Sequence, residues 1–284
     1  MKILVTGANG QLGMSLQRLS KDYPHSFIFA DRNKLNICQK EDVESFIAEQ
    51  KPDIVINAAA YTGVDKAEDE QDLAFLVNAV AVKYLAEACQ KNNVRLIHIS
   101  TDYVFNGKHS TPYSTQDITD PKGVYGKTKL EGEKLALQYC EKTNIIRTSW
   151  LYSEYGNNFV KTMIRLGKER PSLNVVFDQT GTPCYCGDLA KAIMMLAENE
   201  SNEKLFHFSN EGVCSWYDFA KKIMKICHLD CKVLPILSKD YPTKASRPEY
   251  SVLDKGLIKK TLNIEIPHWE DALEEMLVRN NFIL

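Results

Sequence analysis

Short apolar segments alternate with longer amphipathic segments through the first 150 residues of the chain. The apolar segments are KILVTG (2–7), SFIFAD (26–31), DIVINAAA (53–60), RLIHIST (95–101) and NIIRTSW (144–150). Between them, segments such as residues 72–92 carry apolar side chains near the helical period. Strands that are apolar nearly throughout and separated by helices are typical of a parallel sheet covered on both faces. The chain is therefore predicted to be an α/β protein with a doubly wound sheet.

The first apolar segment runs directly into a glycine loop, VTGANGQLG, in which Gly7, Gly10 and Gly13 are spaced three apart. In a strand-turn-helix context such glycines let backbone N–H groups approach a pyrophosphate at a helix N-terminus. Asp31 ends the second predicted strand, where a ribose-binding carboxylate belongs. Close helix–strand packing would also explain Gly10 and Gly13, but it does not explain Asp31. A dinucleotide site on a Rossmann-type sheet is therefore predicted.

The choice of cofactor depends on two neighbouring residues. Asp31 favours a free ribose 2′-hydroxyl, whereas the adjacent Arg32 could accept a 2′-phosphate. NADP is predicted, with NAD left open.

After Trp150 the chain becomes richer in turn-forming residues, as in SEYGNNF (153–159) and FDQTGTPCYCGD (177–188). Helices are expected between these turns at residues 189–198 and 217–227. We expect residues 1–150 to form the dinucleotide-binding domain. Residues 151–284 should form mainly a smaller, partly interleaved substrate-binding lobe, with segments that return to the first domain.

Composition excludes several classes of partner and of site. The net charge of −2 over 284 residues gives no electrostatic reason to expect nucleic acid or an anionic membrane. No apolar run approaches the length of a membrane span, and the apolar start is too short for a signal peptide. We therefore expect a cytoplasmic protein. Its eight scattered cysteines are expected to be free thiols, and a zinc site at Cys184 and Cys186 is the weaker alternative because no His-rich segment is near.

Two Tyr-x-x-x-Lys pairs occur, and their sequence contexts differ. Tyr125 and Lys129 open a predicted helix that follows Thr101, the end of the fourth predicted strand. A lysine ammonium near a phenol would favour the phenolate and lower the tyrosine pKa, which suits proton exchange. Tyr217 and Lys221 instead lie in an apolar helix face. We interpret Tyr217 as packing and Tyr125 as a candidate proton donor.

Strand ends supply further candidates, each with a structural alternative. Ala58, Ala59 and Ala60 are small enough for a cofactor to lie on the backbone, although they would equally suit a tightly packed strand end. Thr101 carries a hydroxyl to the mouth of the predicted site, but a Ser-Thr-Asp run also occurs at ordinary turns. Trp150 could contact substrate or belong to the core.

Taken together, the glycine loop, NAAAYT (57–62), STDYVF (100–105) and YGKTKLEGE (125–133) resemble the extended short-chain dehydrogenase/reductase family. The later segments RTSWLY (147–152), GNNFVKTM (156–163), DQTGTP (178–183) and RPEYSVLD (247–254) resemble its nucleotide-sugar reductases that act on dTDP-4-dehydro-L-rhamnose. The resemblance covers nearly the whole chain. It implies hydride transfer from NADPH, or NADH, to the C4 ketone of that small-molecule sugar nucleotide.

The resemblance also assigns roles to residues. Tyr125 would donate the proton to the developing alkoxide, Lys129 would bind the nicotinamide ribose, and Thr101 would hydrogen-bond the carbonyl. The predicted cofactor-binding residues are Gly7, Gly10, Gln11, Leu12, Gly13, Asp31, Arg32, Asn36, Ile37, Ala58, Ala59, Ala60, Tyr61, Thr62, Tyr125 and Lys129. The predicted substrate-binding residues are Thr62, Val64, Thr101, Asp102, Tyr103, Trp150, Asn157, Asn158 and Arg247.

One departure from the family bears on assembly. Some members carry a glutamate two residues after the third glycine that helps bind magnesium at a dimer interface, and this chain has Ser15 there. Magnesium binding is therefore doubtful, no metal is predicted, and a monomer or weak homodimer is expected. Two other functions stay open at this point: another reductase or epimerase of the same family, and a non-catalytic regulatory subunit resembling that of methionine adenosyltransferase.

Overall fold

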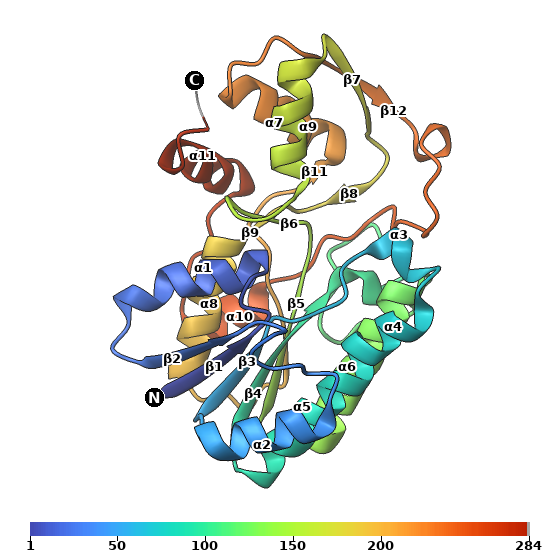
Figure 1. The fold of residues 1–284 in the computed structure, drawn as a ribbon. Coiled ribbons are helices and arrows are strands. Elements are labelled where there is room, and N and C mark those ends of the chain that lie inside the picture. Colours follow the sequence, from blue (N-terminus) through green and yellow to red (C-terminus); the bar gives the residue numbers. More distant parts are fainter. Residues whose placement is uncertain (283–284) are drawn as a thin grey trace.

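The computed structural model describes residues 1–282, which form two lobes (Figure 1). The lower lobe holds a six-stranded sheet in the order β2-β1-β3-β4-β5-β10, and every neighbouring pair is parallel. Its strands are β1 (Lys2–Thr6), β2 (Ser26–Ala30), β3 (Ile54–Asn57), β4 (Arg95–Thr101), β5 (Thr143–Thr148) and β10 (Leu205–His207). The prediction of an α/β fold with a doubly wound parallel sheet is confirmed.

Helices cover both faces of this sheet because successive side chains of each strand point to opposite sides. Ile3 and Val5 of β1 belong to one apolar cluster and Leu4 to another. The first cluster includes residues of α1 (Gln11–Leu19), α8 (Cys186–Glu198) and α10 (Gly256–Leu262). The second includes residues of α2 (Lys40–Gln50), α5 (Ala81–Lys91) and α6 (Val124–Tyr139).

Shorter elements connect the strands of the lower lobe. They are the 3₁₀ turns η1 (Ser20–Asp22) and η3 (Asp102–Val104), the helices α3 (Val64–Ala67) and α4 (Gln71–Phe75), and the π-helical segment η2 (Leu76–Val80). The helix predicted over residues 72–92 is thus present as α4, η2 and α5 in succession. The hydrophobic period alone could not reveal its π-helical middle, since a π segment is a local widening by one residue per turn.

The upper lobe comes mainly from the second half of the chain (Figure 1). Apolar residues of α7 (Phe159–Glu169), α9 (Trp216–Ile226) and α11 (Trp269–Arg279) pack together there in one core cluster. The predicted helices at 189–198 and 217–227 correspond to α8 and α9 and begin slightly earlier. The upper-lobe elements are β6 (Leu151–Tyr152), α7 (Phe159–Glu169), β7 (Ser172–Val176), β8 (Thr180–Gly181), β9 (Cys184–Tyr185), β11 (Cys214–Ser215), α9 (Trp216–Ile226), β12 (Lys232–Ile236), η4 (Ser238–Asp240) and α11 (Trp269–Arg279).

The two lobes are interleaved in sequence, as the predicted fold class requires. After β9 the chain returns to the lower lobe as α8 and β10, and it returns again as α10. Strand order reverses between β1 and β3, which are neighbours in the sheet. In an open parallel sheet such a switch point leaves a crevice beyond the carboxyl ends of the strands.

Candidate active site

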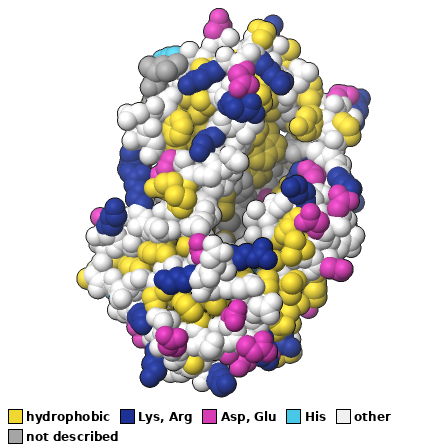
Figure 2. Space-filling view, in the orientation of Figure 1, with side chains coloured by type: hydrophobic (Ala, Val, Ile, Leu, Met, Phe, Trp, Pro, Cys, Tyr) yellow, Lys and Arg dark blue, Asp and Glu magenta, His cyan; other side chains and the backbone are white. Residues whose placement is uncertain are grey.

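A cavity of about 880 Å³ lies at these carboxyl ends. Figure 2 shows the hollow between the two lobes, with hydrophobic side chains inside it. The cavity is lined by the glycine loop, by the ends of β3, β4 and β5, by α6 and by the loop that precedes α7. A ligand in this cavity would therefore touch residues from both lobes.

Nearly all the predicted cofactor-binding residues line the cavity. Gly7 has φ +68, and a Cβ added there would lie 2.6 Å from the Ala59 nitrogen, so only glycine fits between the first loop and the end of β3. Gly13 is the exception, because it is absent from the cavity wall and packs against the backbone of Gly7 and Ala8. The residues of that prediction that line the wall are Gly7, Gly10, Gln11, Leu12, Asp31, Arg32, Asn36, Ile37, Ala58, Ala59, Ala60, Tyr61, Thr62, Tyr125 and Lys129.

The Asp31 carboxylate is held by the loop around it. It accepts hydrogen bonds from the backbone N–H groups of Asn33 and Lys34, both at 3.0 Å, and from the Asn9 side chain at 3.0 Å. The hydrogen bonds, that from the Lys34 backbone foremost, lower the pKa of Asp31. Arg32 is exposed beside it and also borders a smaller hollow of about 210 Å³. The guanidinium is therefore available to an anionic ligand.

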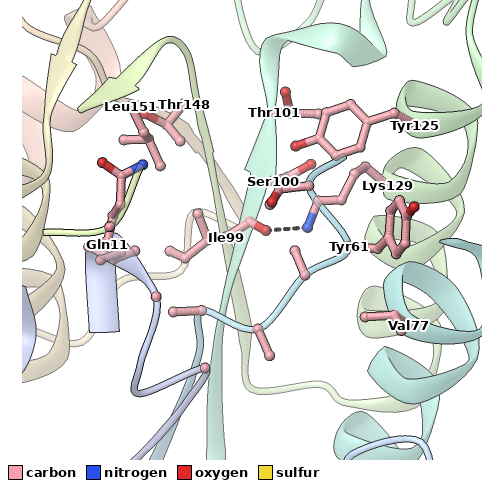
Figure 3. Close-up of a pocket in the computed structure, with 18 of the residues that line it drawn as sticks. Gln11, Tyr61, Val77, Ile99, Ser100, Thr101, Tyr125, Lys129, Thr148 and Leu151 are labelled. Atoms are coloured by element: carbon pink, nitrogen blue, oxygen red, sulfur yellow. Dashed lines mark hydrogen bonds between the residues drawn. The ribbon is translucent and has the colours of Figure 1, made fainter. Parts of the chain in front are cut away.

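Thr101, Tyr125 and Lys129 lie together on one side of the cavity (Figure 3). Gly126 permits this arrangement, since a Cβ there would lie 2.2 Å from the Tyr103 carbonyl oxygen and would push α6 away from η3, the turn that follows β4. The Thr101 hydroxyl donates to Asp102 Oδ1 at 2.9 Å and accepts from the Tyr103 N–H at 3.2 Å. The Lys129 ammonium donates to the Ile99 carbonyl oxygen at 2.6 Å.

Burial sets the protonation of this group of side chains. Burial raises the pKa of Tyr125, although a hydrogen bond with Thr101 opposes the shift. Burial also lowers the pKa of Lys129 to about 8, against the charge of Glu133, which raises it. The prediction that Lys129 lowers the tyrosine pKa is wrong in this structure, because the Lys129 ammonium is bonded to the Ile99 carbonyl oxygen and desolvation of the phenolate dominates. The raised pKa favours the protonated form of Tyr125.

A buried polar network lies behind Lys129. Glu133, one helical turn further along α6, forms a bidentate ion pair with Arg147 of β5 at 2.8 and 2.6 Å. The Ser100 hydroxyl donates to the same carboxylate at 2.5 Å. All three side chains are buried, so the network fastens α6 to β4 and β5 next to Lys129.

The predicted substrate half of the cavity includes an aspartate with an unused oxygen. Asp102 is 2% exposed, and its Oδ2 atom has no hydrogen-bond partner among residues 1–282. Burial raises its pKa to about 6. A buried acceptor without a partner is costly, and a ligand hydroxyl group would satisfy it.

Trp150 also lines this half, in an unusual backbone conformation. Its φ is +44, which is strained for a bulky residue. The indole stacks on Trp216 with ring centroids 3.5 Å apart and lies over Gly181, where a Cβ would clash with it. Packing from the upper lobe thus fixes the ring at the cavity wall. Thr62, Val64, Tyr103 and Asn157 line the wall as predicted.

Two predicted substrate residues are placed differently. Arg247 is not among the cavity-lining residues; its guanidinium donates to Asp65 at 2.6 Å and to the hydroxyl of the cavity-lining Tyr103 at 3.2 Å. Asn158 does line the cavity, but its amide is committed to protein partners. Substrate contact by Arg247 and Asn158 stays a prediction.

Comparison with known proteins places this architecture in a family. The sequence model described as "RmlD substrate binding domain" matches residues 1–282. The chain belongs to this family. The chain is 45% identical to the dTDP-4-dehydrorhamnose reductase of Aggregatibacter actinomycetemcomitans, over 97% of this chain and 98% of that protein.

Solved structures of family members agree closely with the fold. A dTDP-4-dehydrorhamnose reductase from Clostridium acetobutylicum superposes with a TM-score of 0.96 at 43% identity, covering 99% of this chain and 100% of that one. The enzyme of that name from Bacillus anthracis, solved in complex with NADP, gives a TM-score of 0.94 at 40% identity, covering 98% and 99%. The recognition made from the sequence motifs is confirmed.

Several cavity-lining residues of this RmlD family member were not predicted from the sequence. Asn9 lies within the glycine loop, and Thr148, Ser149 and Leu151 surround Trp150 at the end of β5, so their position at strand ends was a usable signal. Leu73 and Val77 come from α4 and η2 and carried no signal beyond helical periodicity. The full set of additional lining residues is Asn9, Leu35, Cys38, Leu73, Val77, Ile99, Ser100, Thr148, Ser149, Leu151 and Gly156.

The second Tyr-x-x-x-Lys pair does not reach the cavity. Tyr217 packs against the upper-lobe core, and the Lys221 ammonium lies over its ring at 5.5 Å.

In residues 1–282 there is no cluster of three or more His, Cys, Asp or Glu side chains that could hold a metal ion. The eight cysteines are free thiols. Within the same range no helix is long and apolar enough to cross a membrane.

Proposed function

We propose that the protein is an NADPH-dependent oxidoreductase that reduces the C4 ketone of dTDP-4-dehydro-L-rhamnose to give dTDP-L-rhamnose. The observation that carries the proposal is the position of Tyr125: protonated, on the cavity wall, and next to Thr101 and Lys129. The names of the relatives support the choice of substrate.

Bound NADPH would supply the hydride. Tyr125 donates its phenolic proton to the oxygen that becomes an alkoxide, because a protonated phenol is the general acid such a reduction needs. Thr101 orients the carbonyl when its hydroxyl hydrogen, which the structure shows donated to Asp102, turns to the ketone oxygen. Lys129 would hold the nicotinamide ribose through its ammonium group, and the Tyr125 phenolate regains a proton from solvent after the product leaves.

The substrate sugar binds between the lower lobe and Trp150. The unpartnered Asp102 oxygen accepts a hydrogen bond from a sugar hydroxyl, and the fixed Trp150 ring packs against the sugar or base. Thr62, Val64, Tyr103 and Asn157 complete this wall. In this proposal residues 1–150 bind the cofactor and also supply most of the substrate wall, and the upper-lobe loop before α7 completes that wall with Asn157.

The preference for NADPH over NADH rests on Arg32. Both oxygens of Asp31 accept hydrogen bonds, Oδ1 from the following loop and Oδ2 from Asn9 of the glycine loop, so this carboxylate is less free to select an unmodified ribose. Arg32 is exposed and has no hydrogen bond or ion pair to another residue in the described part of the chain. A 2′-phosphate would satisfy it.

We also propose that the protein works in the cytoplasm as a monomer or weak homodimer without magnesium. Ser15 donates its hydroxyl hydrogen bond to the Gln11 carbonyl oxygen, and seven of the eight thiols are buried. Sedimentation with and without magnesium tests the assembly, and a magnesium-dependent dimer would contradict it.

The test of the function is consumption of NADPH by purified protein given dTDP-4-dehydro-L-rhamnose, compared with other 4-keto sugar nucleotides. We expect turnover with the rhamnose precursor and free exchange of the cofactor. Tightly bound oxidised NAD in the purified protein, with no net NADPH consumption, would instead indicate an epimerase.

A further inference from the structure

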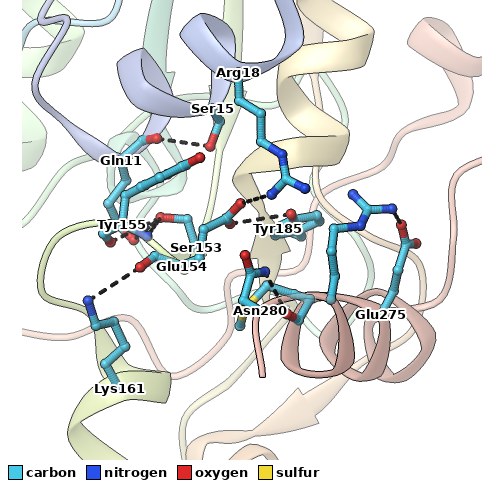
Figure 4. A network of polar contacts seen from close by, with 12 residues as sticks. Gln11, Ser15, Arg18, Ser153, Glu154, Tyr155, Lys161, Tyr185, Glu275 and Asn280 are labelled. Atoms are coloured by element: carbon cyan, nitrogen blue, oxygen red, sulfur yellow. Dashed lines mark hydrogen bonds and ion pairs between the residues drawn. The ribbon is translucent and has the colours of Figure 1, made fainter. Parts of the chain in front are cut away.

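The side chain of Gln11 joins the two lobes (Figure 4). Gln11 is the first residue of α1 and follows Gly10 of the glycine loop. Its Oε1 atom accepts a hydrogen bond from the Asn158 amide at 2.9 Å and another from the Ser153 hydroxyl at 3.0 Å, whose single hydrogen is shared with the Tyr155 carbonyl oxygen at 3.1 Å. Both donors lie in the upper-lobe loop between β6 and α7, more than 140 residues further along the chain.

The orientation of the Asn158 amide is fixed by its other bonds. Its Oδ1 atom caps the N-terminus of α7 by accepting the Lys161 N–H at 3.1 Å. Its Nδ2 atom must then face Gln11, and it also donates to the Ser153 carbonyl oxygen at 2.7 Å. Turning the amide over would set its N–H₂ group against the Lys161 N–H, so the link to Gln11 follows from the helix cap.

Both ends of this link form the wall of the same cavity. Gly10, Gln11 and Leu12 line it from the lower lobe, and Gly156, Asn157 and Asn158 line it from the upper lobe. Gly156 lies close to Gln11, since a Cβ added there would be 3.4 Å from Gln11 Cγ. The conformation of each loop is therefore held by the other.

We propose that Gln11, Ser153 and Asn158 are positioning residues that couple the dinucleotide-binding wall of the cavity to its sugar-nucleotide-binding wall. The inference rests on the proposed function for the identity of the two ligands. Loss of an upper-lobe donor frees Gln11 and the glycine loop, so NADPH binding weakens. Loss of the Gln11 acceptor frees the loop of Ser153 and Asn158, so sugar-nucleotide binding weakens.

A second contact between the same two elements provides a matched control. Arg18 of α1 forms an ion pair with Glu154 at 2.6 Å, and Glu154 also accepts from the Tyr185 hydroxyl at 3.3 Å. Neither residue of this ion pair lines the cavity. Glu154→Gln weakens that contact one residue away from Ser153 and leaves the Gln11 link in place.

The decisive variant is Asn158→Asp. Aspartate keeps the oxygen that caps α7 but loses the donor to Gln11. We expect the Kd of NADPH, titrated with no sugar nucleotide present, to rise about 5- to 50-fold in Asn158→Asp and less than about twofold in Glu154→Gln. Ser153→Ala, which removes the other donor, should also raise the Kd of NADPH. This variant replaces Asn158→Asp if the Asn158→Asp protein fails to fold.

The reciprocal measurement uses Gln11→Met with dTDP as the probe of the sugar-nucleotide site. Its Kd for dTDP should rise at least about fivefold although Gln11 belongs to the glycine loop. Unchanged NADPH affinity in both upper-lobe variants, or an equal loss in Glu154→Gln, would overturn the coupling. The proposed function fails by a different result, absence of NADPH consumption by the wild-type protein.

Discussion

The Lys129 ammonium donates its hydrogen bond to the carbonyl oxygen of Ile99, two residues before Thr101 on β4. This bond holds the lysine of α6 against the strand that carries Thr101, the residue proposed to orient the carbonyl. Tyr125 lies one turn earlier on the same helix. The three proposed catalytic groups are thus positioned by one strand and one helix, and each can be tested separately.

Tyr125→Phe should reduce kcat at least about 100-fold, since it removes the general acid and little else. The affinity for NADPH should change far less, because the ring remains. Steady-state rates and a cofactor titration on the same preparation separate the two effects. A kcat within tenfold of wild type would show that Tyr125 is not the general acid.

The pKa of Lys129, lowered from 10.5 to about 8 by burial, predicts a change of activity with pH. Above pH 8 the free enzyme loses the ammonium, so kcat/KM for NADPH should fall with an apparent pKa near 8. Tyr125, whose pKa is raised, stays protonated over this range. In Lys129→Met the rate should be low throughout and this alkaline decline should be absent.

The same shift predicts how stability changes with pH. Between pH 8 and 10.5 the unfolded chain binds the Lys129 proton more tightly than the folded one, so the free energy of unfolding rises with pH. From pH 7 to pH 10, wild type should gain about 1–3 kcal/mol relative to Lys129→Met in urea denaturation. A constant difference between the two proteins would show that the lysine is not destabilised by burial.

Breaking the buried ion pair between Glu133 and Arg147 should lower the free energy of unfolding more than breaking a surface ion pair does. Glu133→Ala leaves a buried guanidinium without its partner and should cost about 3–5 kcal/mol of unfolding free energy. The matched control on the same helix is Glu131→Ala, which breaks an exposed pair with Lys134 and should cost less than about 1 kcal/mol. Equal losses of unfolding free energy in the two variants would mean that the buried ion pair stabilises the fold no more than the exposed pair does.

Arg32→Ala tests the cofactor preference. Removing the guanidinium should raise the Kd of NADPH about 10- to 100-fold and leave that of NADH within about twofold, because only NADPH carries the 2′-phosphate. The ratio of the two constants, measured by fluorescence titration, reports the effect directly. An equal rise in the Kd values of NADPH and NADH would show that Arg32 does not bind the 2′-phosphate.

Sequence reasoning succeeded where a local pattern determines the structure. Alternating apolar strands and helices dictated the parallel sheet, and the glycine loop dictated the position of the crevice. Tyr125 was separated from Tyr217 by its place after the strand that ends at Thr101. These are relationships between neighbouring elements of the chain.

Sequence reasoning was less successful where packing between distant parts of the chain determines the position of a side chain. Three contacts of this kind join residues from distant parts of the chain. They are the stacking of Trp150 on Trp216, the hydrogen bond between Gln11 and Asn158, and the hydrogen bond between Arg247 and Tyr103. The pKa of Tyr125 depends on the desolvation of the finished cavity, which outweighs the lysine that spacing alone suggested. Such effects exist only after folding.

Transfer of the labelled hydride is the most direct test of the central claim. The protein would be given dTDP-4-dehydro-L-rhamnose and NADPH deuterated at the transferable position of its nicotinamide, and the sugar analysed by nuclear magnetic resonance. We predict dTDP-L-rhamnose with deuterium at C4, one equivalent for each NADPH consumed. An unlabelled sugar, or cofactor that remains unoxidised, would contradict the account.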